Sequence, residues 1–258
     1  MAETDSDRTS QAPQRGFEAF KQHCIAKKLD VLLWTTRFCT MFFTFMYIIP
    51  IFGNPYNSYY KALFANGATS AIRLHQRLPT VSFTREYLTS LLLEDSFHYL
   101  LYSLIFLYVS PVTLTLLPIF LFSMIHFASY SLTLLDTLGQ NSWWGARLLI
   151  SLIEFQSRNI LRLIAFSEII LMPFTIILIL VGRAGLLTPF IYYHFLSMRY
   201  KSMRNPYTRN VFHELRVTTD ALAAKPGTPA MISNILRSIV DFVVKLSPAR
   251  QQQPGAAQ

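Results

Sequence analysis

Three neighbouring residues have the side chains and the spacing for metal or acid–base chemistry. Glu94, Asp95 and His98 lie together in the stretch LLLEDSFHYLLYSLIF, where helical spacing brings His98 close to both carboxylates. Di-iron helical bundles use such carboxylate-x-x-histidine pairs, but they need a second pair and two further glutamates. The apolar segments contain one other candidate carboxylate, Glu168, and no second pair of this kind. The sequence therefore predicts no metal site, no catalytic site and no cofactor here.

The same three residues fit the beginning of a membrane helix better. The chain has no Asp, Glu, Lys or Arg from Ser96 to Leu135, and a helix of this length would be about twice as long as a ~30 Å bilayer core. Acidic side chains in the first turn interact favourably with the positive end of a helix and hold it at the water or headgroup level. We interpret this stretch as a helix start at the membrane surface.

Glu168 needs a separate explanation because it lies inside the apolar segment Leu161–Val181. An ionisable group in a membrane helix is costly and usually has a partner. The sequence leaves two alternatives open: a contact with an arginine or histidine of another helix, or a site for a partner protein or a proton. With Glu94, Asp95 and His98, Glu168 forms a predicted polar network of the membrane domain.

Composition points to a helical membrane protein. Of the 258 residues, 52% are hydrophobic and only 14% are charged, whereas about a quarter are charged in typical soluble domains. The net charge of +9 comes without a nucleic-acid-binding motif. The chain also has neither a Gly-x-Ser-x-Gly motif nor a glycine-rich phosphate loop. These observations argue against nucleic-acid binding, hydrolase chemistry and a small-molecule substrate.

The apolar pattern predicts an all-α polytopic fold with about four membrane helices or hairpins and additional interfacial amphipathic helices. The membrane segments are expected at Val31–Phe52, Ser96–Val109, Val112–Leu135 and Leu161–Val181. Because the second is short for a full span, a shallow hairpin is an alternative. Tyr59–Pro79 is expected to lie on a surface with Asn66 on its polar face, and Leu186–Met198 to be interfacial or re-entrant.

The chain divides by composition into five parts. They are a disordered polar tail (1–26), a helical membrane domain (27–217), a linker (218–229), an amphipathic helix (230–247) and a second disordered tail (248–258). Six Lys and Arg precede Phe38 and ten lie from Arg183 onward, against four and three in the intervening loops. The positive-inside rule therefore predicts that both termini are cytosolic.

Two surfaces near the C-terminus are candidates for contact with lipid or protein. Helical spacing gives the segment 230–247 one apolar face, made of Ile232, Ile235, Leu236, Ile239, Val243 and Leu246. This face is expected to bind the membrane surface or, alternatively, to dock on the protein's own bundle. The preceding segment is basic, and anionic lipid or an acidic partner is expected to contact Arg199, Lys201, Arg204, Arg209 and Arg216.

Four stretches make the chain resemble the transmembrane protein 33 family: RLHQRLP, LLEDSFHYLLYSLIF, NILRLIAFSEIILMP and PFIYYHFLSMRYKSMRNPYTRNVFHELR. The resemblance implies a non-enzymatic protein of the endoplasmic reticulum membrane and nuclear envelope that helps to organise reticulum tubules and nuclear pores. The implied partners are the lipid bilayer, reticulon-type membrane proteins, nuclear pore or transport factors, and stress-signalling proteins. The alternative is a small membrane enzyme or a regulator of ion or calcium handling that uses the intramembrane acidic residues.

Overall fold

The computed structural model describes residues 16–51, 53–78, 80–140, 142–202 and 204–224, together with Asn234 and Ser238. Regular secondary structure in this part of the chain is entirely helical. The predicted C-terminal amphipathic helix at 230–247 and the predicted tail at 248–258 lie outside it, apart from Asn234 and Ser238. The predicted all-α class is confirmed.

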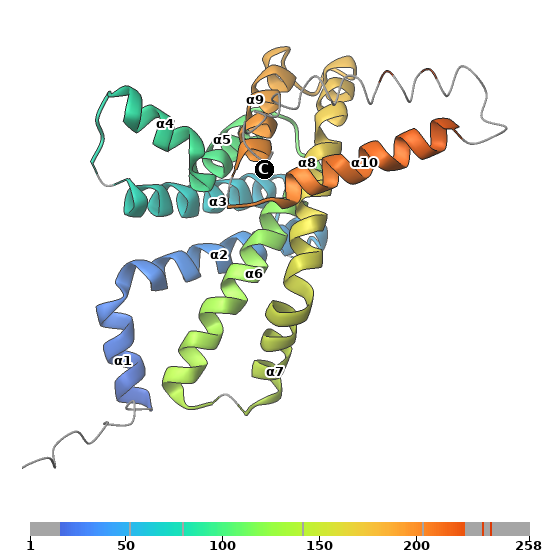
Figure 1. The fold of residues 1–258 in the computed structure, drawn as a ribbon. Helices are drawn as coiled ribbons and strands as arrows, with labels where there is room; N and C mark the ends of the chain where they lie inside the picture. The colour runs from blue at the N-terminus through green and yellow to red at the C-terminus, as the bar shows by residue number, and fades with distance from the viewer. Residues whose placement is uncertain are drawn as a thin grey trace, which may run out of the picture.

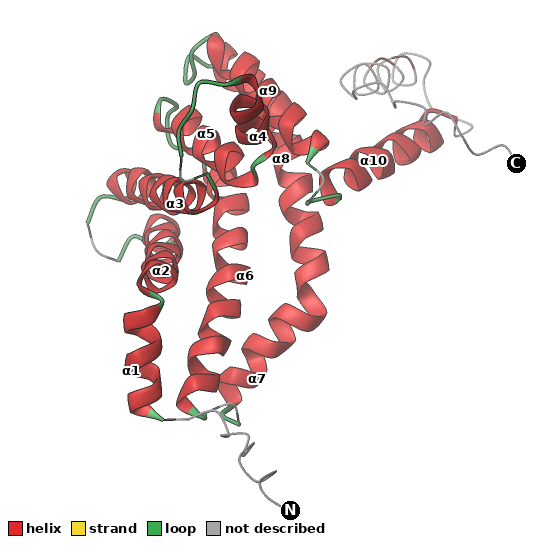
Figure 2. Ribbon diagram, turned by 60° about the vertical axis from the view of Figure 1, so that its left-hand side comes forward, coloured by secondary structure: helices red, strands yellow, loops and turns green. Residues whose placement is uncertain are grey.

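The described helices follow one another with short connections (Figures 1 and 2). They are α1 (Phe17–Ala26), α2 (Lys28–Ile48), α3 (Pro55–Arg77), α4 (Arg85–Leu93), α5 (Asp95–Leu107), α6 (Thr113–Leu138), α7 (Trp144–Ser151), α8 (Ser157–Leu180), α9 (Leu187–Lys201) and α10 (Tyr207–Ala224). A π-helical segment, Leu152–Gln156, joins α7 to α8.

Three of the described helices, α2, α6 and α8, are long and apolar enough to cross a membrane. The predicted polytopic membrane architecture is therefore confirmed in outline. In contrast, α5 and α9 have 13 and 15 residues, or about 20 and 22 Å of helix, which is less than a ~30 Å bilayer core. Helix α5 leads through residues 108–112 into α6, and α8 leads through residues 181–186 into α9; we call these two helix pairs the hairpins and their connections the hairpin tips. Helix α9 packs on α8, whereas α5 packs mainly on α3 and α9.

The turns of the two hairpins are held together. The backbone N–H of Ser110, between α5 and α6, donates to the carbonyl oxygen of Arg183, between α8 and α9, at 3.2 Å. The Arg183 side chain donates in return to the carbonyl oxygen of Pro111 at 2.9 Å. Apolar side chains at these hairpin tips are exposed, namely those of Tyr108, Leu180, Val181, Leu186, Leu187 and Phe190.

Gly182, two residues after the end of α8, has the left-handed backbone conformation, with φ of 72°. The N–H groups of Gly182 and Arg183 turn back onto carbonyls of the last helical turn at 2.8 Å each, which is the hydrogen-bond pattern of a glycine C-cap.

We expect Gly182→Ala to lower stability by about 1 kcal/mol, because a Cβ disfavours this backbone conformation. Gly185→Ala, in the same turn, is the matched control. Neither added Cβ has an atom within 4 Å, and only Gly182 has positive φ. Equal melting temperatures of the two purified variants in detergent would contradict the assignment.

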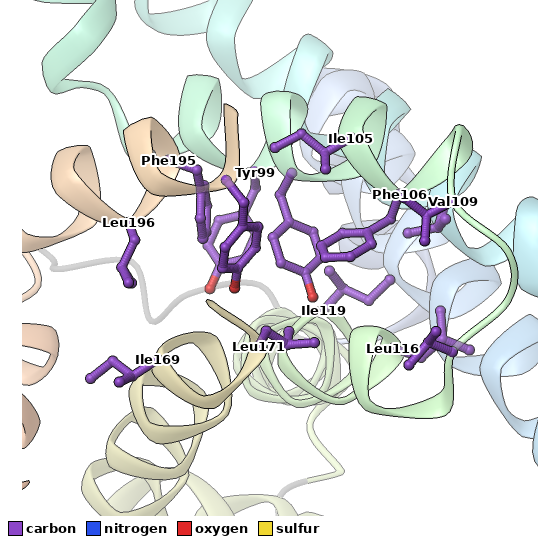
Figure 3. Packing of buried hydrophobic residues seen from close by; sticks show 14 of the residues in the cluster. Tyr99, Ile105, Phe106, Val109, Leu116, Ile119, Ile169, Leu171, Phe195 and Leu196 are labelled. Atoms are coloured by element: carbon purple, nitrogen blue, oxygen red, sulfur yellow. The ribbon is translucent and has the colours of Figure 1, made fainter. Parts of the chain in front are cut away.

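An aromatic core fills the space between the hairpins. Figure 3 shows Tyr99 and Phe106 from α5 with Phe195 from α9, facing Ile119 of α6 and Leu171 of α8. Two buried hydroxyls in this core have partners: Tyr102 donates to the carbonyl oxygen of Thr115 and Tyr192 to that of Glu168, both at 2.7 Å. Such bonds remove most of the cost of burying a phenol among apolar groups.

Three details of the predicted organisation are corrected. Residues 17–26, assigned to a disordered tail, form α1, where His23 lies 3.2 Å from the Tyr130 hydroxyl of α6. Helix α10 continues to Ala224, past the predicted start of the linker at 218, because the sequence DALAA favours helix. Asn66, assigned to an outward polar face of α3, is buried and donates to Ser103 of α5 at 2.8 Å.

Candidate functional site: a buried charge cluster

One arginine joins two acidic residues from two other helices. The Nε of Arg199 on α9 lies 3.1 Å from Oε2 of Glu168 on α8, and its Nη1 lies 3.2 Å from Oδ1 of Asp95, the first residue of α5. Arg199 and Glu168 are fully buried. We call Asp95, Tyr99, Glu168 and Arg199 the buried charge cluster.

Further hydrogen bonds complete this cluster. The Tyr99 hydroxyl donates to Oε1 of Glu168 at 2.7 Å, and the Ser202 hydroxyl donates to Oδ1 of Asp95 at 2.8 Å. The Arg199 guanidinium also lies over the Tyr99 ring, 5.1 Å from its centroid, an arrangement that favours a cation. Both carboxylates therefore have hydrogen-bond donors as well as a positive charge nearby.

The register of the helices places the three charges at one level of the bundle. Each charged residue lies twelve residues from the end of its helix that is nearest the hairpin tip. The distances run from Asp95 to Leu107 in α5, from Glu168 to Leu180 in α8 and from Arg199 to Leu187 in α9. Twelve helical residues correspond to about 18 Å. The charge cluster is thus separated from the apolar hairpin tips by the aromatic core.

A second ion-pair group lies at the start of α5. Both carboxylate oxygens of Glu94 accept hydrogen bonds from Nη1 of Arg77, at 2.9 Å each. Nη1 of Arg204 also contacts both oxygens and lies 3.0 Å from Oε2. Burial raises the pKa of the Glu94 carboxyl; the charge of Arg77 opposes this effect, and the net direction is upward. Glu94 therefore joins the end of α3 to the segment between α9 and α10.

His98 makes a structural contact within this region. Its ring is buried, with Nε2 2.7 Å from the carbonyl oxygen of Leu92 at the end of α4 and Nδ1 3.6 Å from Oδ1 of Asp95. In the part of the chain that the structure describes, no three His, Cys, Asp or Glu side chains are grouped to hold a metal ion. The Asp95-x-x-His98 spacing therefore serves to fix the junction between α4 and α5.

The prediction for Arg199 is wrong. It was assigned to a basic surface for anionic lipid or an acidic partner, but it is fully buried because Glu168 and Asp95 supply its counter-charges. Arg204 is half-exposed and paired with Glu94. Of the other residues in that set, Lys201 and Arg216 are exposed and Arg209 is partly exposed.

Glu168 contacts an arginine of another helix, which was the first of the two alternatives for this residue. Sequence reasoning did not identify Arg199, Tyr99 or Arg77 as partners of the acidic residues. One signal was available, since an intramembrane acid requires a partner and Arg199 follows directly on an aromatic, apolar segment.

The family model for transmembrane protein 33/nucleoporin POM33 matches residues 12–249 of the chain. The chain belongs to this family. The match covers α1 to α10, so every helix that contributes to the buried charge cluster lies within it. The residues of the buried charge cluster thus lie within the region that the transmembrane protein 33 family model matches.

Curated relatives agree along nearly the whole chain. Krueppel homolog 2 of Drosophila melanogaster is 52% identical over 237 residues, which are 92% of this chain and 84% of that protein. Human transmembrane protein 33 is 41% identical over 245 residues, or 94% and 98% of the two chains. The Caenorhabditis elegans homologue is 35% identical over 238 residues, or 90% and 86%. No solved structure matches this family member.

Proposed function

We propose that this protein is a non-enzymatic membrane protein of the endoplasmic reticulum and nuclear envelope. It helps to shape or organise reticulum tubules and nuclear pores through membrane insertion and protein partners, and both of its termini are cytosolic. Membership of a family described as transmembrane protein 33/nucleoporin POM33 supports the pore-related part of this proposal. Reticulon-type proteins, nuclear pore or transport factors and stress-signalling proteins are the proposed partners.

The observation that carries the proposal is the shortness of two hairpin legs. At about 20 and 22 Å, α5 and α9 are too short for a ~30 Å bilayer core. One end of each helix carries a charged residue of the cluster, Asp95 in α5 and Arg199 in α9. The other end of each helix lies at a hairpin tip with exposed apolar side chains. Inserted tip first, these legs occupy one leaflet more than the other, which favours curved membrane.

Helix α10 supports the same placement. It crosses α8 and extends away from the bundle (Figures 1 and 2), and Arg162 of α8 forms an exposed ion pair with Glu214 of α10. Because this ion pair is exposed, it is expected to lie in water or among the lipid headgroups. Lys201, Arg209 and Arg216 are the basic residues proposed to contact anionic lipid or a partner at the same depth. The apolar face predicted at 230–247 is proposed to bind the same membrane surface.

The alternative function, an enzyme or an ion-handling protein that uses the intramembrane acids, has less support. Such a role needs a carboxylate that is available to a cation, proton or substrate. Glu94, Asp95 and Glu168 each already contact at least one arginine. The paired state of these acids therefore favours the structural role.

A charge at the hairpin tip tests the proposal. In liposomes containing the full-length protein, we expect the wild type to narrow the vesicles and Leu186→Asp to reduce this effect strongly. Leu186 is 81% exposed, and an aspartate near the centre of a membrane costs about 2.5–3.5 kcal/mol. Electron microscopy measures vesicle diameter.

Leu186→Phe, which keeps the tip apolar, is the matched control and should behave like the wild type. Two results would count against the proposal: vesicles whose diameter the wild-type protein does not change, or a Leu186→Asp protein that narrows them as well as Leu186→Phe does.

A further inference from the structure

A cationic cavity lies beside the buried charge cluster, on the side of α2 and α3. Its volume is about 280 Å³, and α2, α3, α5 and α6 contribute most of its wall. Four arginines line it, with Asp95 as the one lining carboxylate among the described residues: Arg37, Arg73, Arg77 and Arg204. Such an excess of positive charge in a partly enclosed space attracts anions.

Arg37 on α2 is the most informative of these residues. Its side chain is only 7% exposed, yet its guanidinium makes no hydrogen bond and no ion pair with any residue that the structure describes. Asp30, two turns earlier on α2, contributes an opposite charge from a greater distance. A buried charge without a close partner is costly. An anion bound beside Arg37 would supply the missing counter-charge and remove this cost.

The nearby carboxylates are already engaged. Asp95 accepts from Arg199 and Ser202, while Glu94 accepts from Arg77 and Arg204. Arg73 on α3, like Arg37, has no hydrogen bond or ion pair within the described ranges. Two guanidinium groups of one cavity are therefore left without a paired carboxylate.

Hydroxyl groups add neutral donors to this wall. Ser70 of α3 and Ser123 of α6 both line the cavity and are almost fully buried. Guanidinium forks and hydroxyls together form the kind of donor set that binds phosphate oxygens, with each arginine able to make two parallel hydrogen bonds.

We propose that this cavity binds a phosphate monoester, either free in solution or as the head group of a membrane lipid. A phosphate monoester carries close to two negative charges at neutral pH, which match Arg37 and Arg73, whereas a single carboxylate would neutralise only one of them. The volume lies near the lower end of the range for ligand pockets, roughly 300–1,000 Å³, and suits a head group more than a nucleotide. This binding site goes beyond the proposed organising function.

Binding can be measured on the full-length protein purified in a neutral detergent at fixed ionic strength. The probes are inorganic phosphate, dioctanoyl phosphatidic acid and, as a lipid without net charge, dioctanoyl phosphatidylcholine. We expect saturable calorimetric binding and a rise in melting temperature with phosphatidic acid, with inorganic phosphate, or with both. A response to phosphatidic acid alone identifies a lipid head group, and a response to inorganic phosphate identifies a soluble ligand. Absence of both responses, or an equal response to phosphatidylcholine, overturns the proposal.

Arg37→Gln should weaken this binding at least tenfold. Arg158→Gln, at an exposed position of α8 outside the cavity, also removes one positive charge and should leave the affinity unchanged. In the absence of ligand, Arg37→Gln should melt at the wild-type temperature or above it, because it removes an unpaired buried charge. Unchanged affinity in Arg37→Gln contradicts the assignment. If Arg37→Gln does not fold, Arg73→Gln replaces it, with the same expected loss of affinity and the same contradicting result.

Discussion

Arg199→Met is expected to lower the free energy of unfolding by about 3–5 kcal/mol, which would be among the largest effects of any single substitution in this protein. Methionine keeps most of the side-chain volume but removes the charge, so that Glu168 stays buried without its cation and Asp95 loses one of its donors. Thermal unfolding of the purified full-length protein in detergent measures the loss.

Two further variants distinguish a charge effect from general damage to α9. Lys201→Met removes an exposed basic residue from the same helix and should change stability little. Glu168→Gln combined with Arg199→Met should recover about 0.5–3 kcal/mol, because residues in contact are energetically coupled. Arg199→Met that unfolds at the same temperature as Lys201→Met would refute a stabilising role for the cluster.

Phe195→Ala is expected to cost about 3–5 kcal/mol, the range for removing a large side chain from a packed core. The Phe195 ring is fully buried, with its centroid 5.2 Å from those of Tyr102 and Tyr192. Its loss would leave a void between the two hairpins, and the neighbouring rings would lose their packing contacts. Chemical denaturation in mixed micelles, followed by tryptophan fluorescence, is a suitable measurement.

Phe190→Ala supplies the matched control on the same helix, since the Phe190 side chain is 60% exposed at the hairpin tip. This variant should unfold close to the wild type in detergent. Equal losses of stability in Phe190→Ala and Phe195→Ala would mean that α9 is not packed in the bundle as described.

Features that depend on local pattern could be predicted from the sequence. The absence of charge from Ser96 to Leu135 defined the region of α5 and α6, and Pro111 marked the break between them. The acidic pair Glu94 and Asp95 was placed at a helix start, and α5 does begin at Asp95. In each case the controlling interactions lie within a few residues of one another.

The pairings within the site could not be predicted, because they join distant parts of the chain. Arg199 is 31 residues from Glu168 and 104 from Asp95. The sequence indicates that an intramembrane acid needs a partner, but it does not give the helix packing that selects one arginine among several. Asn66 shows the same limit: helical periodicity placed it outside, and the partner that permits its burial, Ser103, lies on another helix.

The chain order of the buried charge cluster has a consequence for biosynthesis. Asp95 and Glu168 leave the ribosome before Arg199 has been made, so both acids initially lack the cation that later neutralises them. An acid without a partner resists transfer into hydrocarbon, and α5 is also too short to be held there by its own length. We therefore expect the two hairpins to close on each other only after α9 has been synthesised, and a chain ending before Arg199 to remain open with both carboxylates lacking their cation.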